Sequence, residues 1–281
     1  MLSTRTKVAL ASVSYRGVAL LRRLIGRDHH AEVTRGGIRW ALDLREGIDF
    51  SVYLLGGFER RTQRVFRRFI TGGDVALDIG ANVGAHTLPL ARLVGPQGKV
   101  VAFEPTAFAF QKLLKNMSLN PDLASRIVPE QVMLTGNGVE GPAQALYASW
   151  PLTEEDHVHR QLCGVLKPTS GARAATLDDY LAESTMGRVA LIKLDVDGHE
   201  CRVLRGGQRT LARHRPVIVM EMAPYLLSEK QSSLEELLEL LRAAEYTIET
   251  LVTGRPWPLE ARFVRAMVAE GSSVNVIVRP R

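Results

Sequence analysis

The chain has 281 residues, of which 46% are hydrophobic and 23% are charged, and its net charge is +6. This composition is typical of a soluble globular protein with one large core, and it excludes a disordered chain and a fibrous repeat. The positive charge is compatible with an acidic partner such as an anionic substrate, a membrane surface or a nucleic acid.

Residues 1–70 are expected to form an extension before the main domain. Apolar residues at near-helical spacing, with arginines between them, predict an amphipathic helix over residues 8–25. This helix could lie on a membrane or pack on the domain, and packing on the domain is favoured. Alternating apolar residues from Ile38 to Leu44 predict a strand or hairpin arm, and residues 58–70 predict a helix with an arginine-rich outer face. Peripheral membrane contact through the basic N-terminus therefore stays open, and the oligomeric state is not predicted.

Residues 71–281 alternate between short apolar runs and helical patterns, which predicts a parallel sheet. Buried strands are expected at residues 74–78, 99–105, 127–134, 189–195 and 216–221, and closing strands at 246–252 and 274–278. Helices are expected at residues 84–94, 107–119, 200–212 and 232–244, with a further helix opening at Thr176. We expect an α/β fold with a Rossmann-like, doubly wound, mostly parallel seven-stranded sheet.

Two segments of this main domain are less regular. Pro89 falls inside the predicted helix 84–94, so that helix should begin late or kink. Residues 135–173 are rich in Gly, Pro, Ser and Thr and are expected to form connecting strands and a mobile loop. Substrate contacts often lie in such excursions.

The predicted strands end on acids: Asp78, Glu104, Asp195 and Glu221. Ligands of an open parallel sheet bind outside the carboxyl ends of its strands. Any one of these acids could be a helix cap or a surface carboxylate, but four in the same register predict a ligand site.

The sequence of the turn after the first strand of this domain excludes some classes of ligand. A dinucleotide fingerprint that began at Gly80 would need glycines where the chain has Asn82 and Ala85, and no Walker-type sequence occurs. The remaining pattern, Asp78 to Gly84, allows close backbone approach to an uncharged or cationic group. Glu104 lies where a carboxylate can bind both hydroxyls of a ribose.

Several motifs together resemble the FkbM-type family of S-adenosylmethionine-dependent O-methyltransferases. They are DIGANVG at 78–84, FEP at 103–105 with Leu113 and Asn116, TLDDY at 176–180, and LIKLDVDGHE with VLRGG at 191–207. The resemblance runs from about Gly72 to the C-terminus and leaves residues 1–70 outside. It implies the class I methyltransferase fold and S-adenosylmethionine as cofactor, with S-adenosylhomocysteine as product.

The resemblance also implies cofactor contacts. The turn that contains Asp78, Gly80, Asn82 and Gly84 would hold the methionine end of the cofactor, and Glu104 would bind the ribose hydroxyls.

At the other end of the cofactor, Pro105, Gln131 and Val132 would flank the adenine. Asp195 would face the methionine ammonium or the methyl acceptor. Where the family usually has DVEG, this chain has the shorter acid Asp197, which changes the reach of that side chain.

The implied reaction is methyl transfer to a hydroxyl on a sugar, a polyketide or other secondary metabolite, or a glycolipid. The protein must mainly align donor and acceptor. His199 is the first candidate for the base that removes the hydroxyl proton, and Lys193 is a weaker one. A histidine after a strand is, alternatively, a residue of the following helix terminus. No metal is predicted, although Asp195 and Glu221 on adjacent strand ends could share a divalent cation.

Two rival functions remain. A nucleobase amino-methyltransferase would suit the basic charge, but it would be expected to carry an Asn/Asp-Pro-Pro-aromatic turn where this chain has Asp195-Val-Asp-Gly. A catalytically silent binding module could keep the fold and use the basic N-terminus to dock on a partner. The retained Asp78, Gly80, Gly84 and Glu104 argue against such a module.

The cysteines and the N-terminus bear on the compartment. Cys163 and Cys201 are too few for a disulfide framework or a repeated ligand pair, so a reducing compartment is expected. Ser12, Ser14 and Arg16 interrupt the apolar residues near the N-terminus, which therefore lacks the apolar core of a signal peptide or a membrane span. We expect a cytoplasmic protein.

Overall fold

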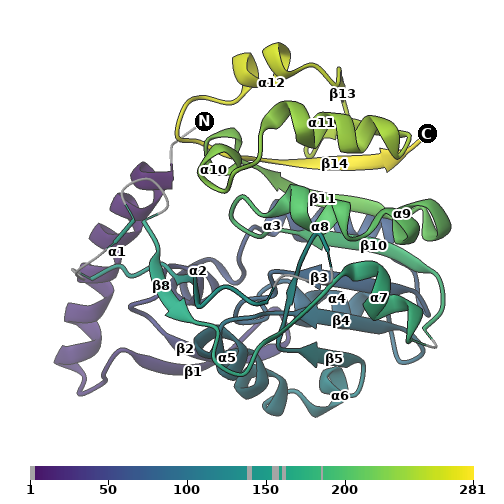
Figure 1. The fold of residues 1–281 in the computed structure, drawn as a ribbon. Coiled ribbons are helices and arrows are strands. Elements are labelled where there is room, and N and C mark those ends of the chain that lie inside the picture. Colours follow the sequence, from purple (N-terminus) through teal and green to yellow (C-terminus); the bar gives the residue numbers. More distant parts are fainter. Residues whose placement is uncertain (1–3, 138–140, 154–157, 160–162, 185) are drawn as a thin grey trace.

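The computed structural model describes residues 4–281 except 138–140, 154–157, 160–162 and 185. Its main sheet has eight strands in the order β13-β12-β14-β11-β10-β3-β4-β5 (Figure 1). The strands are β3 (Val75–Ile79), β4 (Lys99–Phe103), β5 (Ile127–Glu130), β10 (Val189–Leu194), β11 (Val217–Met222), β12 (Tyr246–Thr250), β13 (Pro256–Trp257) and β14 (Val274–Pro280). The strands from β11 to β5 run parallel, and β14 is antiparallel to both its neighbours. The expected doubly wound sheet is confirmed, with the unpredicted two-residue β13 added at its edge.

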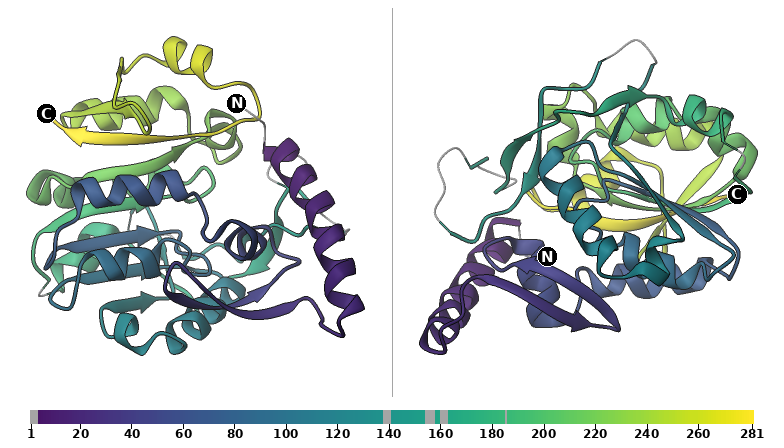
Figure 2. Two further views of the ribbon diagram at one scale, coloured as in Figure 1. Left: turned by 180° about the vertical axis from the view of Figure 1, so that it is seen from behind. Right: turned by 90° about the horizontal axis from the view of Figure 1, so that it is seen from below.

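Helices cover both faces of this sheet (Figures 1 and 2). The helices are α1 (Thr4–Leu24), α2 (Gly47–Leu55), α3 (Arg60–Phe69), α4 (Thr87–Leu93), α5 (Ala107–Ser118), α6 (Pro121–Ala124), α7 (Leu177–Ala182), α8 (Glu200–Arg205), α9 (Gln208–His214), α10 (Pro224–Glu229), α11 (Leu234–Ala243) and α12 (Ala261–Met267). Successive residues of β3 belong to different apolar clusters. The cluster of Leu77 includes side chains of α7, α8, α9 and α11, and the cluster of Ala76 includes side chains of α3, α4 and α5. Both faces of the strand are therefore buried, which explains its continuous apolar run.

Three further strand pairs lie outside the main sheet. They are β1 (His30–Arg35) with β2 (Ile38–Asp43), β6 (Val132–Leu134) with β9 (Arg173–Ala175), and β7 (Ala145–Ser149) with β8 (Val165–Pro168). The single strand expected over residues 127–134 is wrong: it divides at Gln131, and β6 leaves the main sheet to pair with β9. The excursion at 135–173 supplies β7, β8 and β9, and the expected loop includes residues outside the described part of the chain.

One helix prediction needs correction. The helix expected over residues 200–212 divides into α8 and α9 at Gly206 and Gly207, and a Cβ on Gly206 would lie 2.1 Å from the Thr135 backbone oxygen. Helices α2, α6, α10 and α12 were not predicted from the sequence. Pro89 causes no break because α4 begins late, at Thr87, so that Pro89 lies in its first turn.

The N-terminal segment shares the core of the main domain. Trp40, Leu42 and Phe50 belong to the same buried cluster as Leu88 and Val100. Helix α1 stands along one side of the molecule (Figure 2). A boundary near residue 70 stays a prediction. Among the described residues, no helix is both long enough and apolar enough to cross a membrane.

Candidate cofactor and acceptor site

A cavity of about 590 Å³ opens at the carboxyl ends of β3, β4, β10 and β11. It brings together eight residues that the sequence analysis selected: Gly80, Asn82, Glu104, Pro105, Val132, Asp195, His199 and Glu221. The four other selected residues, Asp78, Gly84, Gln131 and Lys193, do not line it. The topology thus collects most of the selected residues in one space.

The turn after β3 packs directly against the end of β10. Gly80 has φ +84°, and a Cβ at this position would lie 1.8 Å from the backbone oxygen of Asp195. The Gly80 N–H donates to the Phe103 oxygen at 3.0 Å, which ties the turn to β4 as well. Asn82 also has a positive φ, +47°. Only a glycine fits at position 80, because both the backbone angle and the space exclude a side chain.

Glu104 is the buried acid that faces this turn. Its Oε1 accepts hydrogen bonds from Thr106 N at 2.9 Å and from Thr106 Oγ1 at 2.6 Å, and its Oε2 accepts one from Asn82 N at 2.9 Å. Burial raises the pKa of Glu104. A carboxylate oxygen has two lone pairs, so Oε2 keeps acceptor capacity for a ligand in the cavity.

Asp78 lies beneath the turn. Its Oδ2 accepts a hydrogen bond from Thr87 Oγ1 at 2.6 Å, and its buried Oδ1 has no hydrogen-bond partner among the described residues. Burial raises the pKa of Asp78. This acid thus joins the end of β3 to the start of α4.

The residues expected beside an adenine divide into two groups. Pro105 and Val132 line the cavity. Gln131 does not, because its Nε2 donates to the Ser170 oxygen at 2.8 Å. Gln131 therefore ties the end of β5 to the segment before β9.

Three carboxylates meet at the ends of β10 and β11. Oxygen atoms of Asp195, Asp197 and Glu221 all lie within 4.8 Å of one another. Lys193 Nζ donates to Asp195 Oδ2 at 2.9 Å, and Ser273 Oγ donates to Glu221 Oε1. Burial and the charge of Asp195 raise the pKa of both Asp197 and Glu221. The cluster favours a positively charged ligand group.

The two candidate bases differ in their surroundings. Burial opposes the charge of Lys193, but Asp195 and Glu59 outweigh it and raise the Lys193 pKa, so this amine stays protonated. Burial, with Lys230 and Arg202, lowers the pKa of His199 to about 4. The buried Nε2 of His199 has no hydrogen-bond partner among the described residues. His199 is therefore neutral at pH 7, with a free ring nitrogen lone pair, although its low pKa makes it a weak base.

Glu59, which no sequence pattern indicated, also lines the cavity. Its Oε2 lies 3.4 Å from His86 Nε2, and its Oε1 accepts a hydrogen bond from Asn275 Nδ2 at 2.6 Å. Burial would raise the Glu59 pKa, but His86, Lys193 and Asn275 outweigh it and lower that pKa to about 2. No sequence signal joins Glu59 to a partner in β14, because they come from opposite ends of the chain.

The segment 135–173 and α2 form another wall of the cavity, which Trp150, Leu152 and Ile48 line. Glu46 accepts hydrogen bonds from Ser149 Oγ at 2.9 and 3.0 Å and from Trp150 N at 3.2 Å. The N-terminal segment is thus bound to the irregular excursion, and both contribute to the site.

Glu200 holds the turn that carries Asp195 and His199, and we expect it to make stability depend on pH. Its Oε1 accepts from Val196 N at 3.4 Å and Gly198 N at 3.3 Å, and burial raises its pKa from 4.5 to about 7. The folded protein keeps a proton that the unfolded chain loses between those values, so stability should fall as pH rises from about 4.5 to 7.

Between pH 5 and pH 7, Glu200→Gln should reduce that fall by about 2 kcal/mol. Urea unfolding of both proteins at pH 5 and pH 7 measures it. An equal pH dependence in the two proteins would contradict the assignment.

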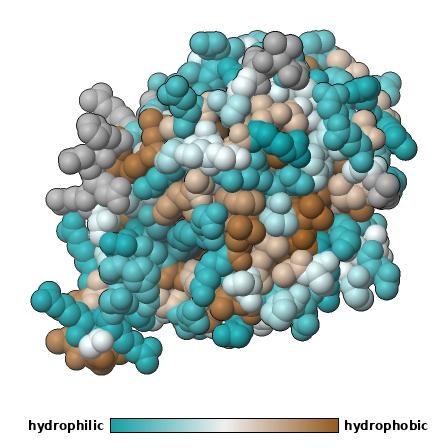
Figure 3. All heavy atoms as spheres, turned by 60° about the horizontal axis from the view of Figure 1, so that its bottom comes forward, coloured by the Kyte–Doolittle hydropathy of each residue, from teal (hydrophilic) through white to brown (hydrophobic). Residues whose placement is uncertain are grey.

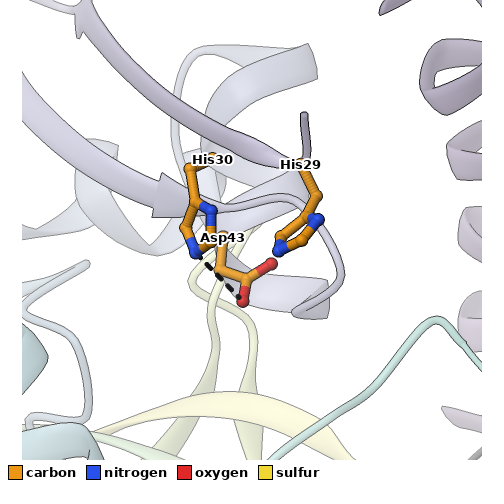
Figure 4. Close-up of side chains that lie close together, drawn as sticks. All are labelled: His29, His30 and Asp43. Atoms are coloured by element: carbon orange, nitrogen blue, oxygen red, sulfur yellow. Dashed lines mark ion pairs between the residues drawn. The ribbon is translucent and has the colours of Figure 1, made fainter. Parts of the chain in front are cut away.

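A second group of ligand-capable side chains lies on the β1–β2 hairpin (Figure 4). Ligand atoms of His29, His30 and Asp43 lie within 4.8 Å of one another, and His30 Nε2 is 4.0 Å from Asp43 Oδ2. Arg45 already donates to both oxygens of Asp43, with its shortest contact at 2.7 Å. None of these residues lines the cavity, so the cluster is separate from the candidate site.

Comparison with known proteins identifies the family of this chain. Methyltransferase 1 of Beauveria bassiana is 31% identical over 147 residues, which cover 46% of this chain and 57% of that protein. The 31-O-demethyl-FK506 methyltransferase FkbM of Streptomyces tacrolimicus is 26% identical over 203 residues, covering 63% of this chain and 74% of its own length. The 2-O-methyltransferase NoeI of Sinorhizobium fredii is 27% identical over 180 residues, which cover 61% of this chain and 72% of that protein. Residues 78–248, more than half of the chain, match the Methyltransferase FkbM domain, and the chain therefore belongs to this family of S-adenosylmethionine-dependent methyltransferases.

Proposed function

We propose that this protein transfers a methyl group from S-adenosylmethionine to a hydroxyl of a small-molecule, sugar or glycolipid acceptor. The observation that carries the proposal is the single cavity that joins the glycine turn and Glu104 to Asp195, His199 and Glu221. The names of the relatives from Streptomyces and Sinorhizobium both denote O-methylation. They support oxygen as the acceptor atom.

The residues present fit the cofactor. Glu104 Oε2, which keeps acceptor capacity, would bind a ribose hydroxyl. The backbone at Gly80 and Asn82 would lie against the methionine part, and Asp195 would bind its ammonium group. Pro105 and Val132 would contact the adenine together. Asp78, Gly84 and Gln131, which do not line the cavity, would support these contacts from behind.

The acceptor would enter between His199 and the wall formed by α2 and Trp150. The bound cofactor supplies a methyl group activated on a sulfonium. The protein's part is to align the hydroxyl with that group and to accept its proton. His199 Nε2 would take the proton, and Lys193 would hold Asp195 in position instead of acting as a base.

Calorimetric titration with S-adenosylhomocysteine tests the proposal. Glu104→Gln should weaken binding by about 10- to 100-fold, because it removes a charge-assisted hydrogen bond to the ribose. Glu130→Gln is a matched control, because Glu130 ends the neighbouring strand β5 without lining the cavity. Thermal melting of both variants checks folding. Absence of binding by the wild-type protein at millimolar ligand would favour the silent binding module.

Metal removal separates this proposal from a metal-assisted reaction. We expect full methyl-transfer rate after exhaustive chelation, because the Lys193 ammonium already neutralises Asp195 at 2.9 Å. The measurement is the rate with EDTA and again after added Mg²⁺. A rate that disappears with EDTA and returns with Mg²⁺ would instead assign Asp195 and Glu221 to a divalent cation.

A further inference from the structure

Helix α1 has two apolar faces. On the inner face, Val8, Ala11, Tyr15 and Val18 pack against the core cluster that also contains Phe50. A second row of apolar side chains recurs with helical spacing and is exposed: Leu10, Val13, Leu20, Leu21 and Leu24. We call this row the outer stripe. An exposed apolar row of this length marks an interaction surface.

The charge on α1 has one sign. Residues 4–24 contain no Asp or Glu, and Arg5, Arg16 and Arg23 are exposed, as is Arg27 just after the helix. Arg22 differs, because it is buried and donates to the backbone oxygens of Asp28 and His30, both at 2.8 Å. Where α1 projects from the molecule at the lower left of Figure 3, hydrophobic and hydrophilic side chains lie next to each other.

The outer stripe extends to the mouth of the 590 Å³ cavity described above. Leu10 belongs to the stripe and also lines the cavity. Leu54 and Leu55 of α2 are likewise exposed and line it. The cavity therefore has a charged inner end at Asp195 and an apolar outer end beside α1.

We propose that the outer stripe docks on an anionic lipid bilayer and sets the apolar mouth of the cavity against the lipid. Leucines would enter the acyl boundary while the arginines contact lipid phosphates, as in helices that lie in the membrane interface. Self-association is disfavoured, because it would bring two acid-free, arginine-bearing helices together. If the protein transfers methyl groups as proposed, this orientation predicts that its acceptor is a molecule whose hydroxyl is attached to a lipid or an aliphatic tail.

Vesicle flotation of the full chain tests the docking and does not depend on methyl transfer. We expect binding to phosphatidylglycerol-containing vesicles, weak binding to pure phosphatidylcholine, and loss of binding at high salt. The double variant Leu20→Asp/Leu24→Asp should reduce binding at least about tenfold, and neutralising Arg23 should reduce it about fivefold. These leucines are 61% and 74% exposed and do not line the cavity, so affinity for S-adenosylhomocysteine should stay unchanged.

A matched control is Val252→Asp/Met267→Asp, which changes two side chains that are 66% and 50% exposed, far along the chain from α1. It should bind vesicles like the wild-type protein. Equal binding by all variants, equal binding to neutral vesicles, or no binding would overturn the proposal. A wild-type dimer in light scattering that Leu20→Asp/Leu24→Asp converts to a monomer, without vesicle binding, would assign the stripe to a second copy of the chain.

The orientation has its own readout. In a Cys163→Ser background, an environment-sensitive fluorophore attached to Leu54→Cys should shift to the blue on vesicle addition. The same label on Val252→Cys should not shift. Bound protein in which the Leu54 label stays in water would overturn the claim that the cavity mouth, and with it a lipid-borne acceptor, faces the bilayer.

Discussion

Replacing Gly80 with alanine is expected to abolish cofactor binding and to destabilise the fold by about 4 kcal/mol or more. The added Cβ would lie 1.8 Å from the Asp195 oxygen, and the backbone φ of +84° is itself unfavourable for alanine. The clashing atom is a backbone atom at the end of the neighbouring strand β10, so no side-chain rotation can relieve the clash. The ends of β3 and β10 would have to separate, which would displace both the turn and Asp195.

Urea unfolding and titration with S-adenosylhomocysteine measure the two effects. Gly72→Ala is the control, because Gly72 has no positive φ and nothing within 4 Å of a Cβ. It should change stability by less than about 0.5 kcal/mol and leave binding intact. A Gly80→Ala protein that binds the ligand normally would disprove the close-packed turn.

Asp195→Asn is expected to lower kcat by at least about 100-fold, because it removes the carboxylate that we propose positions the reacting groups. It should also destabilise the fold by about 3 kcal/mol, because the buried Lys193 would lose the carboxylate that it contacts at 2.9 Å and would keep only Glu59 and Asp78 as acidic neighbours. The two effects have different origins, one in the cavity and one beneath it.

A double-mutant cycle separates them. Lys193→Met combined with Asp195→Asn should recover much of the lost stability, because no unpaired buried ammonium remains, but it should not recover activity. Stability comes from urea unfolding and activity from single-turnover methyl transfer. If the double variant regained activity, Asp195 would matter only as the partner of Lys193.

The alternation of apolar runs and helices was enough to predict the main sheet, and the acids at the strand ends were enough to predict the edge of the sheet at which the cavity lies. Both depend on local pattern and on the rule that parallel strands end at one edge. These local patterns do not predict the direction in which each side chain points. Asp78 and Gln131 come from the right segments, but they bond to Thr87 and to the Ser170 backbone outside the cavity.

Contacts between distant segments explain what the sequence could not show. Glu59 enters the site because Asn275 and His86 hold it there, and Glu46 binds the excursion at Ser149. Such contacts depend on packing in three dimensions and leave no periodic signal in the chain.

The sequence by itself determined the fold class, the glycine turn and the family resemblance, because each depends on residues that lie close together in the chain. Only the tertiary structure decided which acids line the cavity, that the first 70 residues wall it, and that one face of α1 stays exposed. Those outcomes depend on which distant surfaces pack together, and the free energy of that packing is shared among many residues.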